Sequence, residues 1–381
     1  MKVAAFVPAK GSSARIENKN VKLLDGKPLF LHTIDKLLAC DFIDEVWLDT
    51  ESDDVISLAS ERDIKVLHRD PALASNKTDG HQLFLNQVEH CDADICVQVL
   101  GTSPFIEPDT IARGVDALKS GTEHDSAVLV RKDKQYSWAN GKPAYPVERI
   151  PNSVDLPDTV IETMGLYIVP RATALALRRR IGDRPLMLEA SPLEAVDVNW
   201  PEDFALAELI AAGMRERDRR LLNNVKGLLS SPMLSDILDD HGYPNQIIKG
   251  MTPNIPSAKV LGRAKTLRLR GLREGEDFRG IYTALQSYAS VVPNDVIMIE
   301  NEVGQYAYFG ELNANLAIRS GAAGVVVGGK TRDSTDVLRL GLPVFAVTTT
   351  RKLSIADNET FELEVAPTKS SSVAAVRTDE L

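Results

Sequence analysis

The sequence predicts an α/β protein with two domains, each built around a mainly parallel sheet. Its 381 residues exceed the size at which one hydrophobic core usually stops growing. Short β-rich runs alternate with longer helical patterns over residues 1–210, and a second α/β pattern follows without repeating the first. We place the boundary in an Arg-rich helical stretch, which gives domains at 1–219 and 220–381.

The first domain alternates strands and helices in order. We expect strands at residues 2–8, 45–50, 64–69, 95–100 and 126–132, and helices at residues 28–40, 53–63, 81–91 and 109–121. This alternation predicts helices on both faces of a parallel sheet, which binds ligands at the carboxyl ends of its strands. The loops after the first and fourth strands are therefore favoured for chemistry. Residues 138–157 break the pattern, and we expect a lid or a dimerisation excursion there.

The second domain has its own pattern of elements. A helix is expected over residues 201–229, and its Arg-rich stretch is interpreted as a solvated face. Further helices are expected at residues 232–242 and 312–321, and strands at residues 258–272, 295–302, 323–329 and 343–350.

Composition and charge exclude several classes of protein. Residues 1–219 hold 26 Lys and Arg against 36 Asp and Glu, whereas residues 220–381 hold 18 of each. Because nucleic-acid binders normally carry a basic surface, no nucleic-acid partner is expected. Three unevenly spaced cysteines predict neither a disulfide framework nor a zinc site, which favours the cytoplasm. Neither a signal peptide nor a membrane span is expected.

The loop after the first strand combines glycine, serine and positive charge. Its turn at Gly11, Ser12 and Ser13 lets backbone N–H groups approach an anion, and the cations are Lys10, Arg15 and Lys19. The loop has neither the Walker A nor the dinucleotide-binding glycine pattern. The residues alone leave two interpretations open: a triphosphate site and an ordinary polar loop.

Ordered matches across about residues 3–210 resemble the CTP-dependent cytidylyltransferases of 2-keto-3-deoxy sugar acids, the acylneuraminate (CMP-sialic acid synthetase) and 3-deoxy-manno-octulosonate enzymes. The loop is similar to the family's P-A-R-x-x-S-x-R-x-x-x-K pattern, with Lys10 in place of the usual Arg and Asn20 as in the acylneuraminate branch. The segments DGKPLFLHTIDKLL, VWLDTESDDV, VLGTSPFIEPDTI, IETMGLYIVPR and EAVDVNWPEDFALAE follow in the family's order.

The resemblance implies a transferase that joins CMP from CTP to a sugar acid and releases pyrophosphate, with Mg²⁺ or another divalent cation. Lys10, Arg15 and Lys19 would hold the triphosphate, and Asp197 would bind the metal beside Asn199. The remaining nucleotide contacts would come from Gly11, Ser12, Ser13, Asn20, Thr102 and Ser103. From chemistry alone, Thr102 and Ser103 could instead cap a helix, and Asp197 could start one.

Several positions depart from the family pattern. Asn199 replaces the second aspartate of the metal pair, which removes a ligand charge but leaves an amide oxygen. Leu100 stands where the family has glutamine, and Gln98 lies two positions earlier. Ser153 and Val154 replace an Arg-Gln pair, so the sugar acid itself is not specified. A domain that binds nucleotide without catalysis is the alternative.

The second domain contains a candidate site for a small carboxylic acid. A turn at Gly310, Glu311, Leu312 and Asn313 begins a predicted helix, whose free N–H groups favour an anion. Arg332 could hold a carboxylate with two parallel hydrogen bonds, and Asp333 could bind Mg²⁺. The alternative is a surface Arg-Asp pair in a loop.

Residues 231–346 resemble the superfamily of ribonuclease-regulator A and 4-hydroxy-4-methyl-2-oxoglutarate aldolase. Its G-x-R-D core is met by Gly329, Arg332 and Asp333 with one additional residue. The resemblance implies a metal-dependent lyase acting on a 2-oxo acid or, alternatively, a non-catalytic oligomerisation or regulatory module. It also implies a homo-oligomer, since relatives form rings.

Overall fold

The computed structural model describes residues 1–381 except 76, 122, 249, 272–284, 305, 350–360, 365–372 and 377–381, and gives only the backbone for residues 348–349, 361–364 and 373–376. The chain divides into two compact units, Met1–Ile210 and Ala211–Leu381. This division and the expected boundary after residue 219 both lie within one helix, α6 (Pro201–Lys226).

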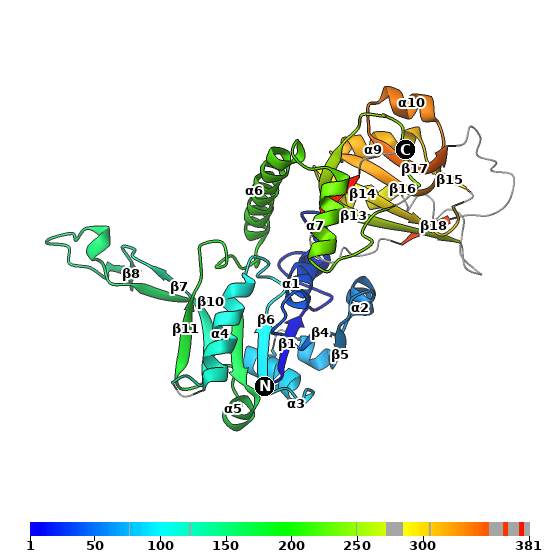
Figure 1. The fold of residues 1–381 in the computed structure, drawn as a ribbon. Coiled ribbons are helices and arrows are strands. Elements are labelled where there is room, and N and C mark those ends of the chain that lie inside the picture. The colour runs from blue at the N-terminus through cyan, green and yellow to red at the C-terminus, as the bar shows by residue number, and fades with distance from the viewer. Residues whose placement is uncertain are drawn as a thin grey trace. The chain divides into compact units, whose positions relative to one another are not determined.

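The first unit is built on a seven-stranded sheet with the order β11-β7-β10-β6-β1-β4-β5 (Figure 1). Its strands are β1 (Val3–Pro8), β4 (Glu45–Thr50), β5 (Lys65–His68), β6 (Ile95–Val99), β7 (Ser126–Asp133), β10 (Thr159–Pro170) and β11 (Pro185–Glu189). Only β10 runs antiparallel to its neighbours. The mainly parallel α/β sheet predicted from the sequence is confirmed.

Helices cover both faces of this sheet because the strands are apolar on both sides. On one face, Val3, Ala5 and Val7 pack with α1 (Leu29–Leu38), α2 (Asp53–Ala59) and α4 (Pro108–Ser120). On the other, Ala4 and Phe6 pack with α3 (Gly80–Glu89) and α5 (Arg171–Leu177). Because β1 and β6 are parallel neighbours, the loop between β1 and α1 and the loop between β6 and α4 emerge at the same edge of the sheet.

The excursion expected at residues 138–157 contains a small hairpin and a short 3-10 helix. The strands β8 (Trp138–Ala139) and β9 (Lys142–Pro143) pair with each other and project away from the main sheet, and η3 (Ser153–Asp155) follows (Figure 1). Trp138 and Val154 expose 64% and 69% of their surface. The pattern breaks here because most of the apolar side chains of this segment are exposed, although Leu156 is buried.

The second unit has a mixed sheet with the order β12-β17-β16-β14-β13-β18. Its strands are β12 (Thr252–Pro253), β13 (Val260–Gly271), β14 (Asp295–Asn301), β15 (Ala307–Phe309), β16 (Gly324–Thr331), β17 (Val344–Thr349), β18 (Phe361–Glu364) and β19 (Val373–Val376). The central strands β13, β14, β16 and β17 are parallel, β15 pairs in parallel with β16, and β12, β18 and β19 are antiparallel additions. Besides the end of α6, the described residues of this unit include the helices α7 (Ser231–Asp240), α9 (Glu311–Arg319) and α10 (Ser334–Arg339).

The core of the second unit positions its candidate site. Phe309 at the end of β15 is fully buried with Ala314 and Ala317 of α9, and Val327 of β16 packs in the same cluster. The turn before α9 and the residues after β16 are thereby fixed at neighbouring strand ends.

Among the described residues of the whole chain, no helix is both long enough and apolar enough to cross a membrane.

Candidate functional site

The loop after β1 is closed by its own side chains and by the neighbouring strand. Asn20 donates from Nδ2 to the Lys10 carbonyl oxygen at 2.7 Å, and the Ala9 N–H donates to the Asp49 carbonyl oxygen at 3.0 Å. A Cβ atom at Gly11 would lie 2.6 Å from the Ser52 Cβ, so glycine is needed for this close approach. Asn20 thus supports the loop's shape from within.

Two cations of this loop, Lys19 and Arg15, contact the segment before α6. Lys19 is 8% exposed and donates from Nζ to the Val198 carbonyl oxygen at 2.7 Å. The Arg15 guanidinium lies over the Trp200 ring at 5.3 Å from its centroid. Burial lowers the pKa of the Lys19 ammonium, while the negative charge of Asp197 raises it and the charges of Arg15 and Lys10 lower it further. Lys19 and Arg15 therefore contact the segment that carries the predicted metal ligand, whereas Lys10 donates from Nζ to the Ala74 carbonyl oxygen at 3.3 Å.

Asp197 is held by neutral groups. The Ser103 hydroxyl donates to its Oδ1 at 3.4 Å, and the Asn199 side-chain amide donates to its Oδ2. Within the part of the chain that the structure describes, Asp197 forms no ion pair with a Lys, Arg or His. A half-buried carboxylate that forms no salt bridge leaves its charge available to a divalent cation.

The metal site expected from Asp197 and Asn199 offers few protein ligands. Over the described residues there is no group of three or more His, Cys, Asp or Glu side chains able to hold a metal ion. Mg²⁺ is commonly bound by one or two carboxylates together with substrate phosphates, so Asp197 and the phosphates of a nucleoside triphosphate would be sufficient ligands. The Asn199 amide, as placed here, presents its NH₂ group to Asp197.

The loop after β6 supports Asp197 directly. The Val198 N–H donates to the Thr102 carbonyl oxygen at 2.8 Å, and Ser103 is 2% exposed with its hydroxyl facing Asp197. Neither residue caps α4, which begins after Glu107. The helix-cap interpretation of Thr102 and Ser103 is therefore wrong, because both are used to fix the segment that carries Asp197.

In the second unit, Arg332 and Asp333 lie against the turn before α9. The Arg332 N–H donates to the Phe309 carbonyl oxygen at 2.9 Å, and Asp333 Oδ2 accepts the Glu311 N–H at 3.2 Å. A Cβ atom at Gly310 would lie 2.5 Å from that Asp333 oxygen and 2.9 Å from Arg332 Nε. Glycine at position 310 lets both side chains reach the helix start.

The four residues of this turn differ in exposure. Glu311 and Leu312 are exposed, the latter by 56%, whereas Asn313 is only 5% exposed. Asn313 lies near the hydroxyls of Tyr288 and Tyr308, whose pKa values are raised mainly by burial. The buried Arg332 Nε lies 3.6 Å from Asp333 Oδ2 and has no hydrogen-bond partner within the described part of the chain. The turn and the Arg-Asp pair thus meet, although Asn313 faces the interior.

Comparison with known proteins agrees with this division into two sites. Residues 4–145 match the family model "Cytidylyltransferase", and residues 231–367 match the model "Aldolase/RraA". The chain joins a cytidylyltransferase domain to an Aldolase/RraA domain. Both family resemblances drawn from the sequence are thereby confirmed.

Three relatives illustrate the similarity of the cytidylyltransferase domain. CMP-N,N'-diacetyllegionaminic acid synthase of Legionella pneumophila is 27% identical over 55% of this chain and 95% of its own length. N-acylneuraminate cytidylyltransferase A of Danio rerio is 25% identical over 60% of this chain and 56% of its own length. A solved CMP:2-keto-3-deoxy-manno-octonic acid synthetase complexed with CTP is 17% identical over 57% of this chain and all of that one, with a TM-score of 0.43.

Several supporting residues of the cytidylyltransferase domain were missed from the sequence. Lys36 donates to the carbonyl oxygens of Pro104 and Ile106 at 2.8 and 2.5 Å, and burial lowers its pKa to about 8. Trp200, which lies beneath Arg15, stands inside the matched segment EAVDVNWPEDF but was not singled out. A lone lysine in an amphipathic helix carries no pattern that predicts such a role.

Gln98 lies in a buried chain of polar side chains on β6. Arg180 donates to its Oε1 at 3.3 Å, and its Nε2 donates to Gln87 Oε1 at 2.8 Å. Gln87 donates in turn to Asp49 Oδ2 at 2.6 Å, and Arg69 Nε donates to Asp49 Oδ1 at 2.8 Å. Gln98 is fully buried, so it does not take the place of the family's glutamine, at whose position this chain has Leu100.

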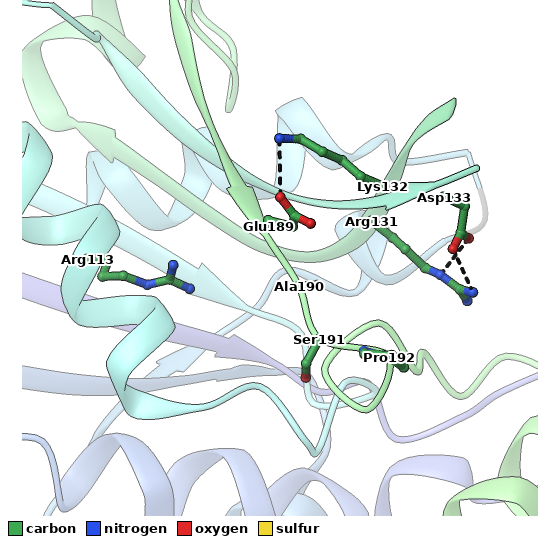
Figure 2. Close-up of a pocket in the computed structure, with 8 residues that line it drawn as sticks. All are labelled: Arg113, Arg131, Lys132, Asp133, Glu189, Ala190, Ser191 and Pro192. Atoms are coloured by element: carbon green, nitrogen blue, oxygen red, sulfur yellow. Dashed lines mark hydrogen bonds and ion pairs between the residues drawn. The ribbon is translucent and has the colours of Figure 1, made fainter. Parts of the chain in front are cut away.

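A polar pocket of about 470 Å³ opens at the carboxyl ends of β7 and β11 (Figure 2). Arg131 pairs with Asp133 at 2.7 Å, and Lys132 pairs with Glu189 at 3.2 Å. Arg113 reaches the pocket from α4 and donates to Thr110 Oγ1 at 3.0 Å. Because β7 and β11 run parallel to each other and in the same sense as β1, the pocket lies at the same sheet edge as the β1 loop.

Proposed function

We propose that the cytidylyltransferase domain transfers CMP from CTP to a 2-keto-3-deoxy sugar acid and releases pyrophosphate. The observation that carries this proposal is the convergence of the β1 loop on Asp197, with Lys19 buried between them. The names of two relatives support the substrate class, because one is a synthase of a CMP-legionaminic acid and the other a cytidylyltransferase of N-acylneuraminate. Nucleotide binding without turnover is the alternative.

In this reaction the anomeric hydroxyl of the sugar acid attacks the α-phosphorus of CTP and loses its proton to solvent, and the bond between the α-phosphorus and the oxygen that bridges to the β-phosphate breaks. Negative charge develops on the departing pyrophosphate, and fixed cations that already face it lower the barrier. Lys10, Arg15 and Lys19 would bind and orient the triphosphate. Mg²⁺ at Asp197 would add charge neutralisation when bound. Thr102 and Ser103 would keep Asp197 in place.

The proposal is tested by incubating the full chain with CTP, Mg²⁺ and a panel of eight- and nine-carbon 2-keto-3-deoxy sugar acids, and by measuring pyrophosphate. We expect release that requires all three components and is lost with EDTA. ATP, GTP and UTP serve as nucleotide controls. Binding of CTP by calorimetry without release for any acid would favour the nucleotide-binding alternative.

Asn199→Asp is expected to lower the Mg²⁺ concentration that gives half-maximal rate. Asn199 contacts Asp197 as a hydrogen-bond donor, so the substitution replaces that donor by a second carboxylate and increases attraction for a hard cation. We expect this Mg²⁺ concentration to fall at least roughly threefold, because two carboxylates attract a hard cation more strongly than one.

The measurement is pyrophosphate release across a Mg²⁺ titration at saturating CTP. Asp203→Asn is not a suitable control because Asp203 accepts the Asn199 and Trp200 N–H groups. Glu202→Gln, on the exposed first turn of α6, changes one charge nearby without touching these contacts. An unchanged Mg²⁺ requirement in Asn199→Asp would separate position 199 from the metal.

For the second domain we propose binding of a small 2-oxo acid with a divalent cation. Gly310 brings Arg332 and Asp333 to the start of α9, where a carboxylate can meet the guanidinium while the Glu311 N–H donates to Asp333 Oδ2. Lyase turnover would additionally require a base to take the proton from the substrate hydroxyl. The second candidate is an oligomerisation or regulatory module that assembles the chain as a homo-oligomer, and ligand binding distinguishes the two.

A further inference from the structure

Glu51 occupies an N–H group of the β1 loop. It immediately follows β4, the strand that pairs with β1, and its Oε1 accepts the Gly11 N–H at 2.8 Å. Its side chain is 17% exposed. A charged carboxylate oxygen therefore sits where a backbone N–H would otherwise meet a phosphate oxygen, in the loop proposed to hold the triphosphate.

The second carboxylate oxygen of Glu51 is poorly satisfied. Among the described residues, Oε2 is buried without a hydrogen-bond partner, and its ion-pair partner is Arg69 Nη1 at 3.7 Å. Burying an ionised oxygen without a hydrogen bond is costly, and an ion pair at that distance offsets the cost only in part. The position of Glu51 is thus stabilised mainly by the single bond to Gly11.

Arg69, in contrast, is firmly anchored. It is 3% exposed, and its guanidinium donates to Asp49 Oδ1 at 2.8 Å and to the Asp49 carbonyl oxygen at 2.6 Å. Asp49 is fully buried. Of the two charged groups beside Gly11, Glu51 is the one that can move, and Arg69 offers a fixed cation toward which its carboxylate can rotate.

We propose that Glu51 is an internal anion that occupies the Gly11 N–H in the nucleotide-free protein and is displaced by the triphosphate. This inference rests on the proposed function. Displacement frees Gly11 to bind a phosphate oxygen, and the Glu51 carboxylate shifts toward Arg69. Glu51 then weakens binding of every polyphosphate and favours release of pyrophosphate, since it competes for the same donor.

The test is calorimetry of the full chain with CTP plus Mg²⁺ and, separately, with sodium tripolyphosphate. Glu51→Gln keeps an oxygen for the Gly11 N–H but removes the competing charge, and we expect its Kd for both probes to fall at least roughly threefold. Glu51→Ala should bind both probes at least as tightly as Glu51→Gln does. Asp53→Asn is the matched control, because Asp53 is a 95%-exposed carboxylate two residues away, and its affinity should stay within about twofold of wild type.

Unchanged or weaker tripolyphosphate binding in both Glu51 variants, with Tm unchanged, would overturn the inference and make Glu51 a support for the loop. An equal gain in Asp53→Asn would also overturn it, because the effect would then be a general loss of negative charge. Tripolyphosphate binding that follows the expected order while CTP gives no pyrophosphate with any acid would support the role of Glu51 and count against the proposed reaction. Absence of binding in all variants would remove the loop as a polyphosphate site.

Discussion

Lys19→Met lowers the kcat/KM for CTP at least about 30-fold, the factor that corresponds to about 2 kcal/mol of transition-state stabilisation from one preorganised charge contact. Lys19 is the most buried cation of the β1 loop, and it is held between Val198 and the charge of Asp197. Methionine keeps most of the side-chain volume. The measured loss therefore reports the missing ammonium group, provided that the domain remains folded.

Lys22→Met supplies the control for this measurement. It removes the same charge three residues later, where Lys22 lies over the Phe204 ring at 4.2 Å and is exposed. Its kcat/KM should stay within about threefold of wild type. All three tryptophans, Trp47, Trp138 and Trp200, belong to the first unit, so their fluorescence checks its folding. Equal rates for wild type and Lys19→Met would exclude Lys19 from phosphate binding.

The affinity for CTP should depend on pH through the protonation of Lys19. Because burial lowers its pKa, Lys19 loses its proton at a lower pH than an ordinary lysine, and affinity for the triphosphate should fall as pH rises through that value. The bound anion favours the protonated form, so binding in this range should take up protons. Lys19→Met should lack both effects.

Arg332→Ala abolishes the heat of binding of oxaloacetate with Mg²⁺ to the full chain. The guanidinium would provide the carboxylate contact, and its buried Nε has no hydrogen-bond partner among the residues that the structure describes. Removal of a bidentate charged contact lowers affinity by about 100-fold or more, which puts a millimolar or weaker complex beyond detection. Arg332→Lys retains charge without the planar fork and should recover only a small part of the affinity.

Two controls accompany the Arg332 measurement. Arg339→Ala removes an arginine from α10 that is 73% exposed and pairs with Asp336, and it should leave the heat unchanged. CTP binding in the first domain should be the same in all three variants. If the wild-type chain gives no heat with oxaloacetate or pyruvate, and sedimentation shows a homo-oligomer, the second domain is the assembly module.

The fold was predictable because each element has a local pattern. Residues 45–50 were expected as a strand and form β4, and the helix expected at 109–121 corresponds to α4 (Pro108–Ser120). Residues 138–157 carry no periodicity, since most of their apolar side chains remain exposed and Leu156 alone does not make a pattern. The small strands β8 and β9 depend on pairing with each other and could not be predicted.

The candidate site was predictable only where residue types follow a known spacing. The loop from Lys10 to Asn20 and the position of Asp197 could be aligned with a family pattern, and the structure places them together. Glu51 and Lys36 act through contacts 40 and 68 residues away in the sequence. Such contacts arise from strand order, which a linear pattern does not contain.

The buried chain from Arg180 to Asp49 has a direction. Arginine only donates and an ionised aspartate only accepts. Each hydrogen bond of the chain must therefore be donated in the same direction, from Arg180 through Gln98 and Gln87 to Asp49. A residue at either middle position must accept on one side and donate on the other. Glutamate at position 87 or 98 would lack the donor and would interrupt the chain in a place that water does not reach. The amide groups of the two glutamines therefore have only one orientation that satisfies both ends, and reversing either one alone would put two donors or two acceptors face to face.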